Sequence, residues 1–148
     1  MSGAAREGDA LEYLAEHGGV SVDLWPNNDT RRSLVTDTAC VADRANYIAT
    51  EWIDLGGKFE NYITAALLGY PMAVAYNDWS HVVMLCDAVE IESGSFGLRI
   101  RNNWSEAWGA KNKFGFGGYA VFREGARSHG RPSSGFALRA VRPSIVAK

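Results

Sequence analysis

A histidine and an asparagine in the stretch HVVMLCDAVEIESGSFGLRIRNNWSEAWG, residues 81–109, have types and spacing that suggest chemistry. His81 begins a predicted strand directly after the turn-like Tyr-Asn-Asp-Trp-Ser, and Asn102 ends a strand that can lie beside it. An amide that bonds to an imidazole keeps the ring in one tautomer and one orientation, as a general base requires. A single His near an Asn is also commonplace, so these residues alone leave both interpretations open.

The two cysteines, Cys40 and Cys86, are the thiols that such a base could activate. Cys86 is five residues from His81 in one predicted strand, so their side chains point to opposite faces, roughly 16 Å apart at about 3.3 Å per residue. We expect Cys86 to be a core thiol. Cys40 falls in the first turn of a helix capped by Asp37, where a lowered thiol pKa is expected, so Cys40 stays open as an alternative nucleophile.

The first half of the chain is predicted to be largely helical. Residues 7–17 place Leu11, Leu14 and Ala15 at helical spacing before a Gly-Gly pair, and His17 falls in the last turn. Residues 22–33 have the composition of a loop. Two helices and a strand are expected next: a short helix from Asp37 or Thr38 to about Arg44, a strand over 46–55, and a helix over 58–69 with Phe59, Ile63, Ala66 and Leu67 on its apolar face.

The second half is predicted to be built of strands. Five are expected, over residues 71–76, 81–91, 96–102, 115–122 and 135–141. The polar segment 125–135 between the last two is a predicted loop, with His129 solvated. The expected fold class is α+β: one domain, residues 1–148, with an antiparallel β sheet or barrel and two or three flanking helices.

Composition excludes several kinds of partner. Hydrophobic residues make up 47% and charged residues 22% of the chain, and the formal charge is −2. These values are those of a globular protein and give no reason to expect nucleic acid. No apolar run approaches the roughly 18–20 residues of a membrane span, and the first residues lack the apolar core of a signal peptide. We expect a protein made in the cytoplasm, with reduced cysteines and without metal or cofactor.

The segments GYPMAVAYNDWSHVVML and GLRIRNNWSEAWGAKNKFGFGGYAVF resemble the C-terminal half of papain-like cysteine peptidases. The resemblance places His81 at the catalytic base of that family and Asn102 at its orienting asparagine. It places Trp104 at the indole that shields the His–Asn hydrogen bond from water, and Trp108 in the Trp-Gly pair that follows. The likeness extends over about residues 8–142 and is greatest to papain-like proteins of bacteria and their phages. Asn103 and Ser105 depart from the family's usual Ser and Gly.

The nucleophile of that family lies N-terminal to all of these motifs, beside a Gln. The seven residues MSGAARE before the region of resemblance contain neither Cys nor Gln. The chain is therefore expected to be a partial papain-like domain that lacks the nucleophile segment. A pairing of His81 with Ser80 or Ser105 is a further alternative, without an orienting motif.

Two functions follow from the resemblance. The preferred one is a non-catalytic papain-like protein that binds a protein partner or self-associates, such as a phage virion component in capsid decoration. Its contact face would carry Trp79, Trp104 and Trp108 around the former cleft, because aromatic residues suit protein contacts. In that case His81 and Asn102 are vestigial. The alternative is the His/Asn-bearing part of a cysteine peptidase whose Cys comes from another chain.

Overall fold

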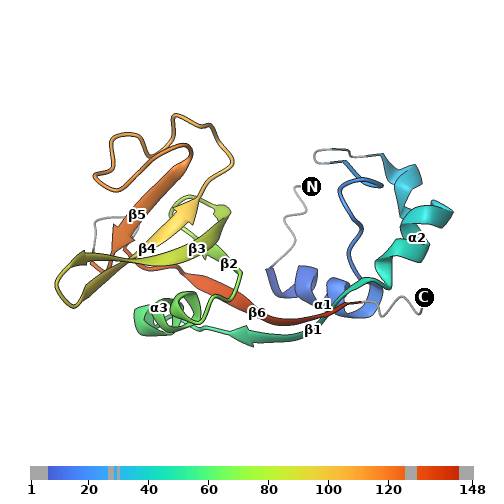
Figure 1. The fold of residues 1–148 in the computed structure, drawn as a ribbon, viewed down its shortest axis with the longest axis horizontal. Helices are drawn as coiled ribbons and strands as arrows, with labels where there is room; N and C mark the ends of the chain where they lie inside the picture. Colours follow the sequence, from blue (N-terminus) through green and yellow to red (C-terminus); the bar gives the residue numbers. More distant parts are fainter. Residues whose placement is uncertain (1–6, 27–28, 30, 126–129, 144–148) are drawn as a thin grey trace. The chain divides into compact units, whose positions relative to one another are not determined.

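The strands of the chain form one antiparallel sheet. A computed structural model describes residues 7–26, 29, 31–125 and 130–143. Within them lie three α-helices, a short 3-10 helix and six strands, and the strands are arranged in the order β1-β6-β2-β3-β4-β5 (Figure 1). The expected α+β class is confirmed at this level. Because β1 and β5 stand at the two ends of this order, the sheet is open.

The chain divides into two compact units, and each has its own set of elements. Unit 1 comprises residues 1–52 and 139–148, and unit 2 comprises residues 53–138. Unit 1 contains α1 (Glu7–His17), η1 (Arg32–Val35), α2 (Thr38–Arg44) and most of β1 (Tyr47–Asp54). The Asp37 carboxylate accepts hydrogen bonds from the backbone N–H groups of Ala39 and Cys40, which confirms Asp37 as the predicted cap of α2.

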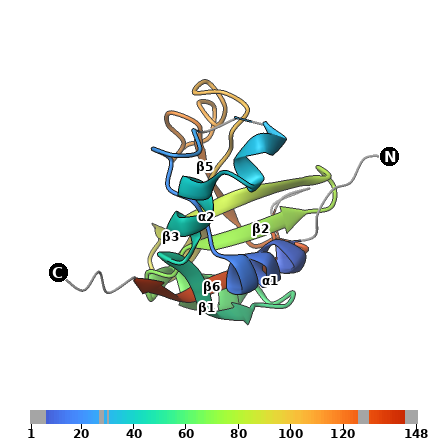
Figure 2. The same cartoon turned by 90° about the vertical axis from the view of Figure 1, so that its right-hand side faces the viewer.

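Unit 2 holds the other helix and most of the sheet. Its elements are α3 (Phe59–Leu67), β2 (Met72–Tyr76), β3 (His81–Glu92), β4 (Ser95–Arg101), β5 (Tyr119–Arg123) and the first part of β6 (Ser134–Pro143). The strand predicted over 115–122 begins only at Tyr119, because residues 109–118 form turns. In both views β1 and β6 run side by side (Figures 1 and 2). His129 lies outside the described residues.

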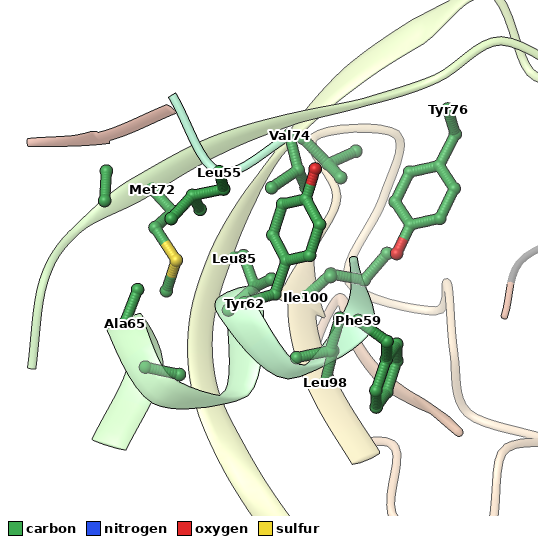
Figure 3. Close-up of a cluster of buried hydrophobic side chains, with 13 residues drawn as sticks. Leu55, Phe59, Tyr62, Ala65, Met72, Val74, Tyr76, Leu85, Leu98 and Ile100 are labelled. Carbon is green, nitrogen blue, oxygen red and sulfur yellow. The ribbon is translucent and has the colours of Figure 1, made fainter. Parts of the chain in front are cut away.

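The core of unit 2 lies between α3 and one face of the sheet. Tyr62 projects from α3 toward Val74, Leu85 and Ile100 on three strands, and all four side chains are fully buried (Figure 3). The predicted apolar face of this helix is wrong at Leu67, which is 61% exposed. The buried residues of α3 are Phe59, Tyr62, Ala65 and Ala66, so the face that packs on the sheet lies one residue to the side of the predicted face.

The register of three strands brings the two candidate residues to the same end of the sheet. Tyr76 at the end of β2 pairs with His81 at the start of β3. Further along, Met84 on β3 pairs with Arg101, the last residue of β4. Asn102 directly follows Arg101, so it lies at the same end of the sheet as His81, where β4 ends and β3 begins.

No helix in the described part of the chain is long and apolar enough to span a membrane.

Candidate functional site

His81 and Asn102 meet side chain to side chain. Nε2 of His81 lies 3.1 Å from Oδ1 of Asn102. Asn102 is only 2% exposed, and its backbone N–H donates to the carbonyl of Gly118 at 3.0 Å. An amide oxygen can only accept, so in this arrangement a neutral His81 ring has its proton on Nε2 and its lone pair on Nδ1. The predicted contact is confirmed, whereas a catalytic role of the two residues stays a prediction.

Trp104 covers one face of the imidazole. The two rings are stacked with centroids 5.1 Å apart and planes inclined by 26°. Trp104 is 56% exposed, so its other surface is open to solvent. The indole therefore limits the access of water to the His81–Asn102 hydrogen bond and also offers an aromatic surface beside the base.

Trp79 and Trp108 are more buried than expected for residues of a contact face. Both are partly buried and pack against the core of unit 2. Their ring centroids are 6.0 Å apart in an edge-to-face arrangement, and Trp79 is also 6.0 Å from Trp104. Of the three tryptophans, Trp104 is the one that is largely exposed, so it is the residue available for contact with another molecule.

The loop after Asn102 is held closely to the sheet, which fixes the position of Trp104. The backbone N–H of Gly118 donates to the carbonyl of Glu106 at 3.0 Å. The Glu106 carboxylate accepts a hydrogen bond from Arg101 at 3.0 Å, and the Arg101 guanidinium lies 4.9 Å from the ring centroid of Tyr119. Both contacts hold Glu106, which lies between Trp104 and Trp108, to residues at the two ends of the loop.

Two contacts near His81 have no signal in the sequence. Tyr76 packs on Trp79 with ring centroids 4.8 Å apart, and the hydroxyl of Ser133 accepts a hydrogen bond from the backbone N–H of Asn77 at 3.0 Å. Ser133 is 56 residues away in the chain. Only a correct pairing of β2 with β6 could have brought it to this turn.

The structure corrects both expectations for the cysteines. Cys86 is exposed, so the prediction of a core thiol is wrong; its strand alternates, with Val83 and Leu85 buried and Cys86 on the other face. Cys40 is 1% exposed and its thiol points at the carbonyl of Leu24, 3.9 Å away. Burial first, and then the Asp37 carboxylate, raise the pKa of the Cys40 thiol above its ordinary value. The expected lowering is therefore wrong, because burial disfavours the charged thiolate and the Asp37 carboxylate repels it.

Other sites of chemistry are not evident in the described residues. Among them, no group of three or more His, Cys, Asp or Glu side chains could hold a metal ion. A hollow of about 600 Å³ lies at the turn between β3 and β4, lined by Phe59, Ile63, Phe96 and Arg123 among others. This is the opposite end of β3 from His81. No protein-family model and no curated protein matches the sequence.

Proposed function

We propose that this chain carries the base half of a papain-like cysteine peptidase site, which a thiol from outside residues 1–148 completes. The observation that supports this most is the hydrogen bond from His81 to Asn102 under Trp104. Within the described residues no group bonds to Nδ1 of His81. A base with one nitrogen fixed and the other open is arranged to accept a proton from a partner.

The chemistry follows from which nitrogen is open. Nδ1 of His81 takes the proton of the thiol, and the thiolate attacks the carbonyl carbon of a peptide. The imidazolium then gives that proton to the leaving amine, and His81 next activates the water that hydrolyses the thioester. Asn102 accepts from Nε2–H in both the neutral and the charged ring, so it keeps the ring in place throughout.

The test is to produce the chain together with the polypeptide encoded immediately before it and to assay hydrolysis of a fluorogenic peptide. We expect hydrolysis and labelling of a partner cysteine by a thiol-directed epoxide. His81→Ala should lower the rate by about 10²–10⁴-fold, the usual contribution of a general base. The chain alone should neither hydrolyse the peptide nor be labelled by the epoxide.

Two control variants test whether the cysteines of this chain contribute to the hydrolysis that His81 supports. Cys40→Ser and Cys86→Ser should leave the rate of the mixture unchanged, because Cys40 is buried and Cys86 lies on the opposite face of β3 from the buried core residues. Hydrolysis that survives His81→Ala, or that disappears in Cys40→Ser, would contradict this assignment.

A second candidate is a non-catalytic binding or structural component, such as a phage virion protein. The exposure of Trp104 favours it, and so does unit 1, where large apolar side chains are open to solvent. These are Tyr13, Val22, Leu24, Val35, Val41 and Tyr47. Among the described residues of unit 1, only Cys40 and Ala49 are buried hydrophobic residues. Apolar side chains that are open to solvent are available for contact with a partner.

The second candidate predicts association without turnover. The mass of the chain in solution, alone and with the polypeptide encoded beside it, should exceed that of a monomer. Trp104→Ala should weaken the association by more than about 1 kcal/mol, the usual threshold for a contact that matters. A strictly monomeric chain under both conditions would contradict it.

A further inference from the structure

Trp79 stands at the centre of the aromatic cluster beside His81. Its ring centroid lies 4.8 Å from that of Tyr76, 6.0 Å from that of Trp104 and 5.9 Å from that of Phe122. Trp79 is also two positions before His81, inside the turn that joins β2 to β3. Trp79 therefore contacts the core of unit 2, belongs to the turn that leads into His81, and packs near the Trp104 indole that stacks on the His81 ring.

The turn itself, residues 77–80, is tightly constrained. The backbone N–H of Trp79 donates to the carbonyl of Tyr76 at 3.0 Å, and that of Ser80 donates to the carbonyl of Asn77 at 3.1 Å. Ser80 has a φ of 50°, the only positive value for a non-glycine residue in the described part of the chain. A side chain with a Cβ is disfavoured in this left-handed region.

A disfavoured backbone conformation persists only where contacts with the surrounding structure stabilise it by more than the conformation costs. Two contacts of this turn contribute such stabilisation. One is the packing of Trp79 among its aromatic neighbours, and the other is the hydrogen bond from Asn77 to Ser133. Together they fix both ends of the turn, and Ser80 directly precedes His81.

We propose that Trp79 is a positioning residue for the His81 base. By anchoring the turn and supporting Trp104, it keeps Nε2 of His81 on Asn102 and so leaves Nδ1 facing outward. The catalytic purpose of this positioning rests on the proposed function, but the positioning itself is a property of the chain alone and is measured without any partner.

The competing explanation is that Trp79 only fills space in the core. Phe122 separates the two, because it belongs to the same aromatic cluster, with centroids 5.9 Å from Trp79 and 6.3 Å from Trp108. Phe122 lies on β5, in neither the turn nor the loop that carries Trp104. Its truncation should therefore loosen the cluster without releasing His81.

The experiment measures how fast the Nε2 proton of His81 exchanges with water. Proton–nitrogen correlation NMR of the isotope-labelled chain gives this rate. We expect Trp79→Leu to speed this exchange about tenfold or more and to weaken the ring-to-ring contact signal between His81 and Trp104, since local opening governs such exchange. Trp79→Phe should restore most of the protection. Phe122→Leu should lower the thermal midpoint but change the exchange by less than about twofold. Equal effects of Trp79→Leu and Phe122→Leu, in proportion to lost stability, would overturn the proposal.

A second variant keeps the proposal testable if Trp79→Leu does not fold. Ser80→Gly should fold, because glycine adopts this φ freely. Because Trp79 still anchors the turn in this variant, exchange of the His81 proton should change by less than about twofold while the thermal midpoint is not lowered. A severalfold rise of the exchange in Ser80→Gly would show that the restriction at Ser80, and not Trp79, holds the ring, and would overturn the proposal; no assay of hydrolysis enters either result.

Discussion

The hydrogen bond between His81 and Asn102 is buried on one side only. Asn102 is 2% exposed, whereas His81 is partly open to solvent beside Trp104. Among the described residues the Nδ2 group of Asn102 has no hydrogen-bond partner. Burying such a donor costs free energy, so within the described chain the amide is held in place by its oxygen and by its backbone.

Replacement of Asn102 by alanine tests this arrangement at the scale of one residue. The variant removes the acceptor of the His81 proton, so the free energy of unfolding should fall by about 0.5–1.5 kcal/mol, the usual net contribution of one hydrogen bond, because the partly exposed His81 can bond to water instead. Asn103→Ala is the matched control, because Asn103 is exposed and should change stability by less than about 0.5 kcal/mol. Denaturant unfolding measures both, and equal losses would show that the contact contributes nothing to stability.

The segment between β4 and β5 is the element that places Trp104 and Trp108. Gly109 has a φ of 79°, and a Cβ at this position would lie 2.0 Å from the carbonyl oxygen of Tyr119. Gly94 has a similar φ of 72°, but a Cβ there would meet no atom within 4 Å. The two glycines therefore share a left-handed φ but differ in how closely other atoms crowd them.

Gly109→Ala should unfold or shift this segment, whereas Gly94→Ala should not. We expect Gly94→Ala to cost about 1–2 kcal/mol, the penalty of a left-handed conformation for a residue with a Cβ. Gly109→Ala should cost about 2 kcal/mol more, because rigid backbone must also move. Thermal unfolding with tryptophan fluorescence measures the stability of both and the environment of Trp104. Equal stability of the two variants would contradict the close packing of this segment.

Periodicity and capping residues predicted the positions of the elements well, because these signals are local. Asp37 caps α2 as expected, and the helices and strands lie within a few residues of the predicted ranges. The errors concern which face is covered, as at Leu67 and Cys86, both of which are exposed. Whether a side chain is buried depends on which elements pack over it, and these elements are distant in the sequence. A local sequence pattern therefore cannot predict it. The His81–Asn102 contact came from the family resemblance, not from residue spacing.

At the scale of the whole molecule, the two units differ in how many hydrophobic residues they bury. Unit 2 has a continuous core between α3 and the sheet, and the candidate site lies where β3 begins and β4 ends. Unit 1 has two buried hydrophobic residues among those described. The site therefore stands on the unit with the continuous core, which suits a site that must keep one geometry. A base that is held in one orientation is what the proposed function requires.

The state of the His81 imidazole tests that proposal most directly. Nitrogen NMR of the chain alone, at a pH where the ring is neutral, distinguishes the proton on Nε2 from the proton on Nδ1. The account predicts a proton on Nε2, held by Oδ1 of Asn102, with an unprotonated Nδ1 that can accept a proton from a thiol. A neutral ring with its proton on Nδ1 would mean that Asn102 donates through its amide nitrogen. His81 would then have no base to offer on its open side, and the proposed function would be contradicted.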